Sequence, residues 1–275
     1  MSTPLHGAAL RGDTLEAEEL LAEGATVDAH DPFGRTPLHE AARCGKTRFA
    51  EFLLTRGADD DARDECGFTP LHLAAAHAHP DVILALLKHG ADKDARNSVG
   101  ETPLHDAADA TSTSAARVLL EYGAKTELCG RNQNRPLHLA AYHAFPCLAQ
   151  ELLEHGADAN ARNINGCTPL HHATTWGRTR TVHSLLCHGA DIEMRNHNGD
   201  TPLHRAACEQ KIRATRALLE AGAEMEEPEE QFTRYISEPR KKNQMPTKKR
   251  KLAQTQEPHN DNPEAKKART YHWWR

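Results

Sequence analysis

Hydrophobic positions in the first 224 residues recur with a fixed spacing. Leu-Leu doublets begin at positions 20, 53, 86, 119, 152, 185 and 218, each 33 residues after the one before, and a glycine lies three residues after every doublet. A shorter apolar stretch precedes each doublet. In one copy it contains Leu38, Ala41 and Ala42, a spacing that gives a helix a single apolar face. The pattern therefore predicts two short amphipathic helices in every 33 residues.

A recurring tetrapeptide marks where each first helix begins. Thr-Pro-Leu-His occurs at positions 3, 36, 69, 102, 168 and 201, and the copy at 135 reads Arg-Pro-Leu-His. Thr36 suits a helix N-cap, and Pro37 suits the first helical position, where the missing N–H costs nothing. Gly57 follows the second helix at a position typical of a left-handed C-cap. Turn-rich segments such as residues 64–67 then lead to the next unit.

A 33-residue period with this tetrapeptide resembles the ankyrin repeat. The resemblance covers residues 1 to about 224 and implies an all-α repeat solenoid, a curved stack of helix-turn-helix units with β-hairpin finger loops on one side. A lone repeat has nothing to bury its leucine doublet against, so stacking must supply the stability. We expect seven repeats in the domain 1–224, at approximately 1–30, 31–63, 64–96, 97–129, 130–162, 163–195 and 196–224.

Two repeats depart from the pattern. The fifth has Gln133 where the others have Gly, and Arg135 where the others have Thr. Loss of the capping hydroxyl costs about 0.5–2 kcal/mol, so we predict a local weak point there. The second helix of the last repeat carries Lys211, Arg213 and Arg216, a polar pattern that suits a terminal cap facing water.

Charge divides the chain into two parts. Residues 225–275 hold 12 Lys/Arg and 8 Asp/Glu, whereas residues 1–224 hold 22 and 31, within a total net charge of −5. An acidic repeat region argues against direct nucleic-acid binding by that region. After residue 224 the periodicity ends, and few apolar residues remain, which predicts a disordered acidic-then-basic tail over 225–275.

Basic clusters in this tail resemble nuclear localisation signals, which an import receptor reads as an extended peptide. They consist of Arg240, Lys241, Lys242, Lys248, Lys249, Arg250 and Lys251. We therefore expect the nucleus, with the cytoplasm as a further location. A solvated charge run or a loose phosphate-binding patch is the alternative, and the role of the aromatic end Tyr271–Arg275 stays open.

The chain is rich in histidine and cysteine, but neither residue is spaced for metal binding. Seven of the 19 histidines occupy the motif position, where the ankyrin resemblance implies a structural hydrogen-bonding role. His143 with Cys147, and His171 with His172, have no second pair at tetrahedral-site spacing. The seven cysteines form no CxxC pair, which favours reduced thiols. We expect no metal and no cofactor.

Signatures of catalysis and of membrane insertion are also missing from the sequence. It contains no G-x-S-x-G elbow, no P-loop and no G-x-G-x-x-G, so we expect no enzymatic activity. No apolar run is long enough to cross a bilayer, and the first repeat begins at once, so we expect neither a signal peptide nor a membrane partner.

The ankyrin resemblance implies that partners bind the finger tips and the exposed face of each first helix. Aromatic residues and Arg dominate binding hot spots, and this chain is only 5% aromatic. The alternative for each residue singly is packing against a neighbouring finger. The predicted partner-binding positions are Phe33, Arg35, Arg43, Phe68, His77, Glu101, Asp109, Arg131, Tyr142, His143, Trp176 and Asp200.

These features predict a non-enzymatic protein–protein interaction scaffold. A nuclear transcriptional coregulator or inhibitor fits best, with a protein partner such as a transcription factor in its concave groove. The alternative is a cytoplasmic adaptor or a ubiquitin-ligase substrate-recognition subunit, although no F-box or SOCS-type segment is recognisable after the repeats. Asn160 resembles sites modified by an asparaginyl hydroxylase, but turn hydrogen bonds are the favoured reading there.

Overall fold

The computed structural model describes residues 3–143 and 145–224, which fold into short α-helices joined by turns. The helices are α1 Pro4–Arg11, α2 Thr14–Ala22, α3 Pro37–Arg43, α4 Thr47–Thr55, α5 Pro70–Ala76, α6 Pro80–His89, α7 Pro103–Asp109, α8 Thr113–Glu121, α9 Pro136–His143, α10 Pro146–Glu154, α11 Pro169–Thr175, α12 Thr179–Cys187, α13 Pro202–Cys208 and α14 Ile212–Glu220. A 3-10 turn, η1, spans Arg131–Gln133. The predicted all-α class is confirmed.

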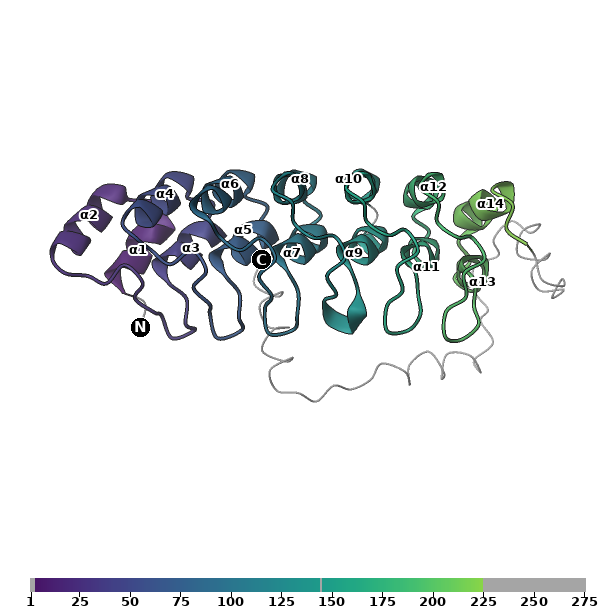
Figure 1. The fold of residues 1–275 in the computed structure, drawn as a ribbon, viewed down its shortest axis with the longest axis horizontal. Helices are drawn as coiled ribbons and strands as arrows, with labels where there is room; N and C mark the ends of the chain where they lie inside the picture. Colours follow the sequence, from purple (N-terminus) through teal and green to yellow (C-terminus); the bar gives the residue numbers. More distant parts are fainter. Residues whose placement is uncertain (1–2, 144, 225–275) are drawn as a thin grey trace, which may run out of the picture. The chain divides into compact units, whose positions relative to one another are not determined.

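The helices of residues 3–224 form two rows (Figure 1). Odd-numbered helices lie side by side in one row and even-numbered helices in the other, and long loops project beyond the odd-numbered row. Each helix packs against its hairpin partner and against the helix two further along the chain, as α5 does with α6 and α7. This arrangement is the repeat solenoid that the 33-residue period predicts.

The core lies between the two rows and is made of the predicted leucines and alanines. In the middle repeats the first leucine of each doublet is completely buried, and the second keeps at most a small exposed edge, as Leu86 and Leu87 do. Ala74 and Ala75 on α5 are also fully buried, so their small side chains allow neighbouring helices to approach closely. At the N-terminal end Leu20 and Leu21 are only half-buried because no described repeat precedes them.

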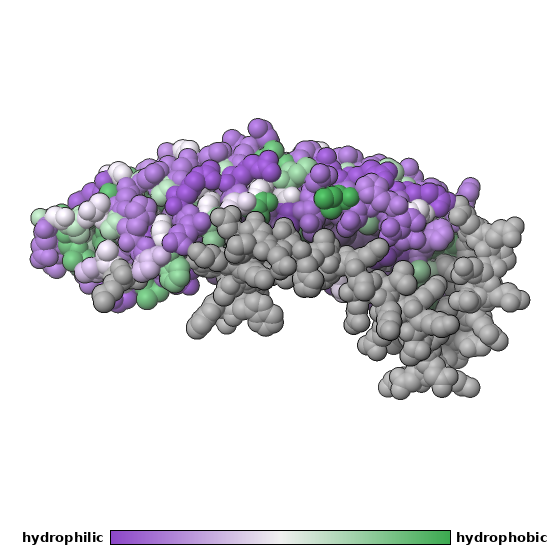
Figure 2. Space-filling view, turned by 90° about the horizontal axis from the view of Figure 1, so that it is seen from below, coloured by the Kyte–Doolittle hydropathy of each residue, from purple (hydrophilic) through white to green (hydrophobic). Residues whose placement is uncertain are grey.

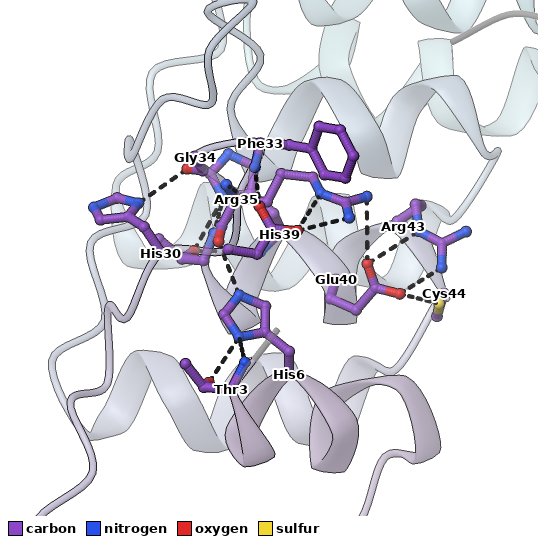
Figure 3. Close-up of polar contacts among 12 residues, drawn as sticks. Thr3, His6, His30, Phe33, Gly34, Arg35, His39, Glu40, Arg43 and Cys44 are labelled. Carbon is purple, nitrogen blue, oxygen red and sulfur yellow. Dashed lines mark hydrogen bonds and ion pairs between the residues drawn. The ribbon is translucent and has the colours of Figure 1, made fainter. Parts of the chain in front are cut away.

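The motif histidine joins each repeat to the next. Nδ1 of His39 lies 3.0 Å from both the amide nitrogen and the hydroxyl of Thr36, and its Nε2 lies 2.9 Å from the Phe68 carbonyl oxygen. A carbonyl can only accept, so Nε2 carries the proton and Nδ1 accepts. His6 makes the equivalent bond to the Arg35 carbonyl (Figure 3). The predicted structural role of these histidines is therefore confirmed.

In the finger loops, which precede the odd-numbered helices, the side chain of the first residue holds the turn by accepting hydrogen bonds from backbone amides. Asp64 Oδ1 accepts from the amides of Cys66 and Phe68, each at 2.9 Å, and Asn163 does the same for residues 165 and 167 at 3.0 Å. These bonds, together with a left-handed glycine such as Gly67 (φ +76°), make tight turns. The expected β-hairpins are therefore turns, and none of the described residues belongs to a β-strand.

The fifth finger is built differently. Its first residue is Gly130, which has no side chain to accept hydrogen bonds, and the chain instead forms the 3-10 turn η1. Asn132 and Gln133 take positive φ angles of 56° and 57°, a region that glycine tolerates far better. Of the two contacts that Thr36 makes to Nδ1 of its motif histidine, Arg135 keeps only the one from its amide, which donates to His138 Nδ1 at 3.1 Å.

The last described helix exposes the charged residues that a terminal cap requires. Arg213 and Arg216 of α14 are exposed, whereas Ala214 and Leu218 are buried against the preceding repeat. Within the described residues, no helix is both long and apolar enough to span a membrane. The predicted disordered tail and its basic clusters lie outside the described residues and stay predictions.

Candidate partner-binding surface

The inner-helix surface comprises the finger loops and the exposed C-terminal ends of the odd-numbered helices. Figure 2 views the described repeats from the finger side, and the surface that it shows is largely hydrophilic, with apolar patches at the N-terminal end and near the middle of the repeats. All twelve predicted partner-binding residues lie on these loops and helix ends. The structure brings some of them into contact and leaves others apart.

Four predicted residues from three consecutive repeats form one cluster. Tyr142 and Trp176 meet edge to face with ring centroids 4.9 Å apart, and Tyr142 meets His143 at 4.8 Å. His143 Nε2 lies 2.8 Å from Asp109 Oδ1 on the preceding repeat. Both large rings remain accessible, with 39% of Tyr142 and 45% of Trp176 exposed. The cluster is therefore an ordered aromatic surface flanked by a carboxylate.

A second cluster surrounds Glu40 (Figure 3). Arg35 contacts it with Nη1 3.7 Å from Oε2, and Arg43 donates to it through Nε at 3.2 Å. Burial alone would raise the pKa of Glu40, but the hydrogen bond from Arg43 and the charges of both arginines lower it. Arg35 also donates to Asp31 at 2.7 Å, and its guanidinium lies 5.2 Å from the Phe33 ring. Arg35 and Arg43 are thus already engaged within the chain.

Asp106 occupies the position in α7 that Glu40 occupies in α3, but no arginine accompanies it. Its Oδ2 atom is buried and has no hydrogen-bond partner among the described residues. Burial raises the pKa of Asp106 well above its ordinary value, and the nearby charges of Glu101 and Asp109 raise it further. The residues at the same position in the flanking repeats are Leu73 and Leu139. This unpartnered carboxyl was not among the predicted site residues.

The other predicted residues lie apart from these clusters. Phe68 is half-buried with its ring edge to face against His72 at 5.6 Å, so it serves packing as well as any binding role. His77 is exposed and stacks near His79, with centroids 6.4 Å apart. Arg131 is exposed in η1, and Asp200 faces Arg205 at 3.9 Å.

The described residues contain no group of three or more His, Cys, Asp or Glu that could hold a metal ion. Asn160 makes turn contacts: its Oδ1 accepts from the Asp191 amide at 2.7 Å, and its Nδ2 donates to the Gly189 carbonyl at 3.0 Å. This geometry agrees with the favoured structural reading of Asn160.

Sequence reasoning missed Asp106 and Arg178. Arg178 donates from Nε to the Tyr142 carbonyl at 3.2 Å and so ties the aromatic cluster to the next repeat. Aligning the repeats at the position after the motif histidine would have shown Asp106 between two leucines. No sequence signal indicates that Asp106 Oδ2 lacks a hydrogen-bond partner among the described residues, because that depends on the neighbouring repeats.

Comparison with known proteins supports the fold. A family model for ankyrin repeats (3 copies) matches residues 2–64, 50–129, 94–163 and 137–229. The crystal structure of the ankyrin repeat domain of Bcl-3, described as a unique member of the IkappaB protein family, is 32% identical with a TM-score of 0.69, over 79% of this chain and 98% of that one. The human ASB11 ankyrin repeat domain is 28% identical with a TM-score of 0.74, over 82% of this chain and 100% of that one. No curated protein matches in sequence. Since the family model covers most of its length, the chain belongs to the ankyrin-repeat family.

Proposed function

We propose that this protein is a nuclear coregulator or inhibitor that binds a transcription factor on its inner-helix surface. Ankyrin repeats are protein–protein interaction modules, and these families are generally non-enzymatic. The observation that carries the proposal is the Tyr142–Trp176 pair, two large rings held in contact and yet left accessible. Exposed aromatic residues with a fixed geometry lose little entropy on binding and are typical of hot spots.

Two further facts support the nuclear part of the proposal. The 32% identity to Bcl-3 extends over nearly all of that ankyrin domain, and Bcl-3 is described as an IkappaB family member. The basic clusters after the repeats provide a candidate address for an import receptor, with Lys248–Lys251 as the densest one. A cytoplasmic adaptor or ubiquitin-ligase substrate-recognition subunit is the competing function.

Localisation of the tagged full-length chain tests the nuclear part. Wild type should be nuclear, and a variant with Lys248, Lys249, Arg250 and Lys251 changed to Ala should shift to the cytoplasm. A wild-type chain that stays in the cytoplasm would favour the adaptor function instead.

Proximity labelling in cells tests the binding surface. Tyr142→Ala combined with Trp176→Ala should lose the labelled partners that wild type retains. The matched control is Tyr122→Ala, because Tyr122 is also 39% exposed but is the C-cap residue of α8, in the other row of helices. Equal loss of partners in the control would contradict a specific role for the inner-helix surface.

A further inference from the structure

Two ion pairs join neighbouring even-numbered helices in the same geometric sense. Arg117, the fifth residue of α8, donates from Nε at 3.1 Å to Oε1 of Glu151, the sixth residue of α10. Glu18, the fifth residue of α2, accepts at 2.6 Å from Arg56, the C-cap residue of α4. In both junctions the fifth residue of a helix faces the following repeat, and the sixth residue or the C-cap residue faces the preceding one.

The two ends of the described stack carry residues of opposite charge at these same positions. The helices α2 and α14 are the first and last even-numbered helices and lie at opposite ends of their row (Figure 1). The fifth residue of α14 is Arg216, which is exposed. The sixth residue and the C-cap residue of α2 are Glu19 and Glu23, and both are exposed. A polar outer face on the terminal repeats keeps solenoids soluble, but these two ends are also complementary in charge.

The apolar positions of the two end helices match those of the junction between α8 and α10. The helix α14 reads Ile-Arg-Ala-Thr-Arg-Ala-Leu-Leu-Glu and shares five positions with α8, Thr-Ser-Ala-Ala-Arg-Val-Leu-Leu-Glu. The helix α2 shares an Ala, a Glu and two leucines with α10. Leu20 of α2 is only half-buried, whereas its counterpart Leu152 is completely buried, and Ile212 of α14 is 42% exposed. Each end thus leaves apolar surface that a further repeat would cover.

We propose that a second copy of this chain continues the stack, with its α2 placed against α14 of the first copy as α10 is placed against α8. Arg216 of the first copy then donates to Glu19 of the second, as Arg117 donates to Glu151 within the chain. The contact joins two different surfaces, so one end of each kind stays free and more than two copies can assemble. This surface is separate from the finger side, so the inference goes beyond the proposed function.

One difference between α2 and α10 limits the strength of this contact. Glu16 of α2 stands where α10 has Leu148, which is completely buried. Glu16 also pairs with Arg11 of its own repeat, so the end at α2 offers less apolar surface than α10 does. The association is therefore reversible and sensitive to salt, because exposed ion pairs are weak and are screened by ions.

Sedimentation velocity of the full-length chain in reducing buffer tests this inference. The weight-average mass of wild type should rise with protein concentration at low salt and fall at about 1 M salt, where the Debye length is about 3 Å. Arg216→Glu and Glu19→Arg each bring like charges together at the junction, so each should weaken association at least about tenfold. Both positions are exposed, so the thermal midpoint should stay unchanged.

A mixture of these two variants gives the sharper result. It restores one junction of wild-type residues, between Arg216 of the Glu19→Arg chain and Glu19 of the Arg216→Glu chain. The mixture should therefore associate although neither variant does so alone. The matched controls are Arg180→Glu on α12 and Glu51→Arg on α4, which make the same charge changes at exposed positions inside the stack. Each control should associate like wild type.

Three results would overturn the inference: a wild-type mass that stays monomeric at every concentration, single end variants that associate like wild type, or a mixture that stays monomeric. None of these measurements involves Tyr142, Trp176 or a cellular partner. Self-association and the proposed function can therefore fail separately, and each failure is visible by itself.

Discussion

The finger at residues 163–168 and the finger at residues 130–135 both lead into a first helix, but different side chains hold their turns. In the first, Asn163 caps two amides, Gly166 takes a positive φ, and Thr168 caps the following helix. In the second, the corresponding residues are Gly130, Gln133 and Arg135, and a 3-10 turn replaces the capped loop. The repeat thus tolerates loss of all three finger residues as long as the motif histidine remains.

The common element of the two fingers is the histidine bridge. His171 Nε2 donates to the Asp200 carbonyl at 3.0 Å, and His138 Nε2 donates to the Cys167 carbonyl at 3.1 Å. In both fingers Nδ1 accepts from the amide three residues earlier, at 3.1 Å. Both fingers therefore keep the imidazole that links one repeat to the next. We infer that the fold cannot replace this part of the motif.

Acid should break both kinds of finger, and this is the largest effect we expect. Burial lowers the pKa of His39, His72 and His105 to about 4 and that of His138 to about 3, compared with 6.5 in an unfolded chain. The unfolded state therefore binds more protons below pH 6.5. Stability present above pH 6.5 should fall as pH drops towards 4, by about 1.4 kcal/mol per pH unit for each histidine.

Urea unfolding between pH 7 and pH 4.5 measures this slope. Buried carboxyls with raised pKa values, such as Asp64, oppose the trend because they gain stability as they are protonated. Replacement of the exposed His183 by Gln provides a control that should leave the slope unchanged. A free energy of unfolding that is equal at pH 7 and pH 5 would contradict the role assigned to the buried imidazoles.

Replacement of Gly130, the first residue of the fifth finger, by asparagine should also destabilise the protein, although it restores the residue type found in other fingers. A Cβ atom at Gly130 would lie 2.9 Å from Glu101 Cγ and 3.0 Å from the His105 ring. Gly130→Asn should therefore cost about 1–3 kcal/mol from overpacking, although it supplies the missing hydrogen-bond acceptor. Chemical denaturation at pH 7 measures this change in the free energy of unfolding. The reverse exchange, Asn163→Gly, should also lower stability, because it removes the side chain that accepts hydrogen bonds from two amides. A gain in stability for Gly130→Asn would show that the fifth finger is a defect and not a self-consistent alternative.

The sequence was sufficient for the parts of the structure that repeat. The leucine doublets, the Thr-Pro helix starts and the structural histidines follow from local preferences applied with one period. The sequence was insufficient wherever a contact depends on how a neighbouring repeat packs. Tyr142 and Trp176 occupy different positions within their repeats, so their contact depends on how α9 and α11 pack. The lack of a hydrogen-bond partner for Asp106 Oδ2 among the described residues, and the room taken by Glu101 beside Gly130, likewise depend on three-dimensional neighbours.

The smallest expected effect is a gain from restoring the regular cap at position 135. Arg135 pairs with Glu127 at 2.9 Å, but its Nη1 is buried without a partner. Arg135→Thr should remove that unpartnered donor and restore the hydroxyl that caps the helix, so it should stabilise the protein by about 0.5–2 kcal/mol. Loss of the partly exposed ion pair with Glu127 offsets part of this gain, because such pairs contribute at most about 1 kcal/mol.

Hydrogen exchange shows where that gain is located. In wild type, amides of residues 136–143 should exchange faster than those of the equivalent helix α11, because their N-cap lacks the hydroxyl. Arg135→Thr should slow exchange in α9 and leave α3 unchanged, since α3 already has its threonine cap and lies three repeats away. If α9 is already as well protected as α11 in wild type, the irregular finger costs nothing. The histidine bridge alone would then be enough to anchor a first helix in this stack.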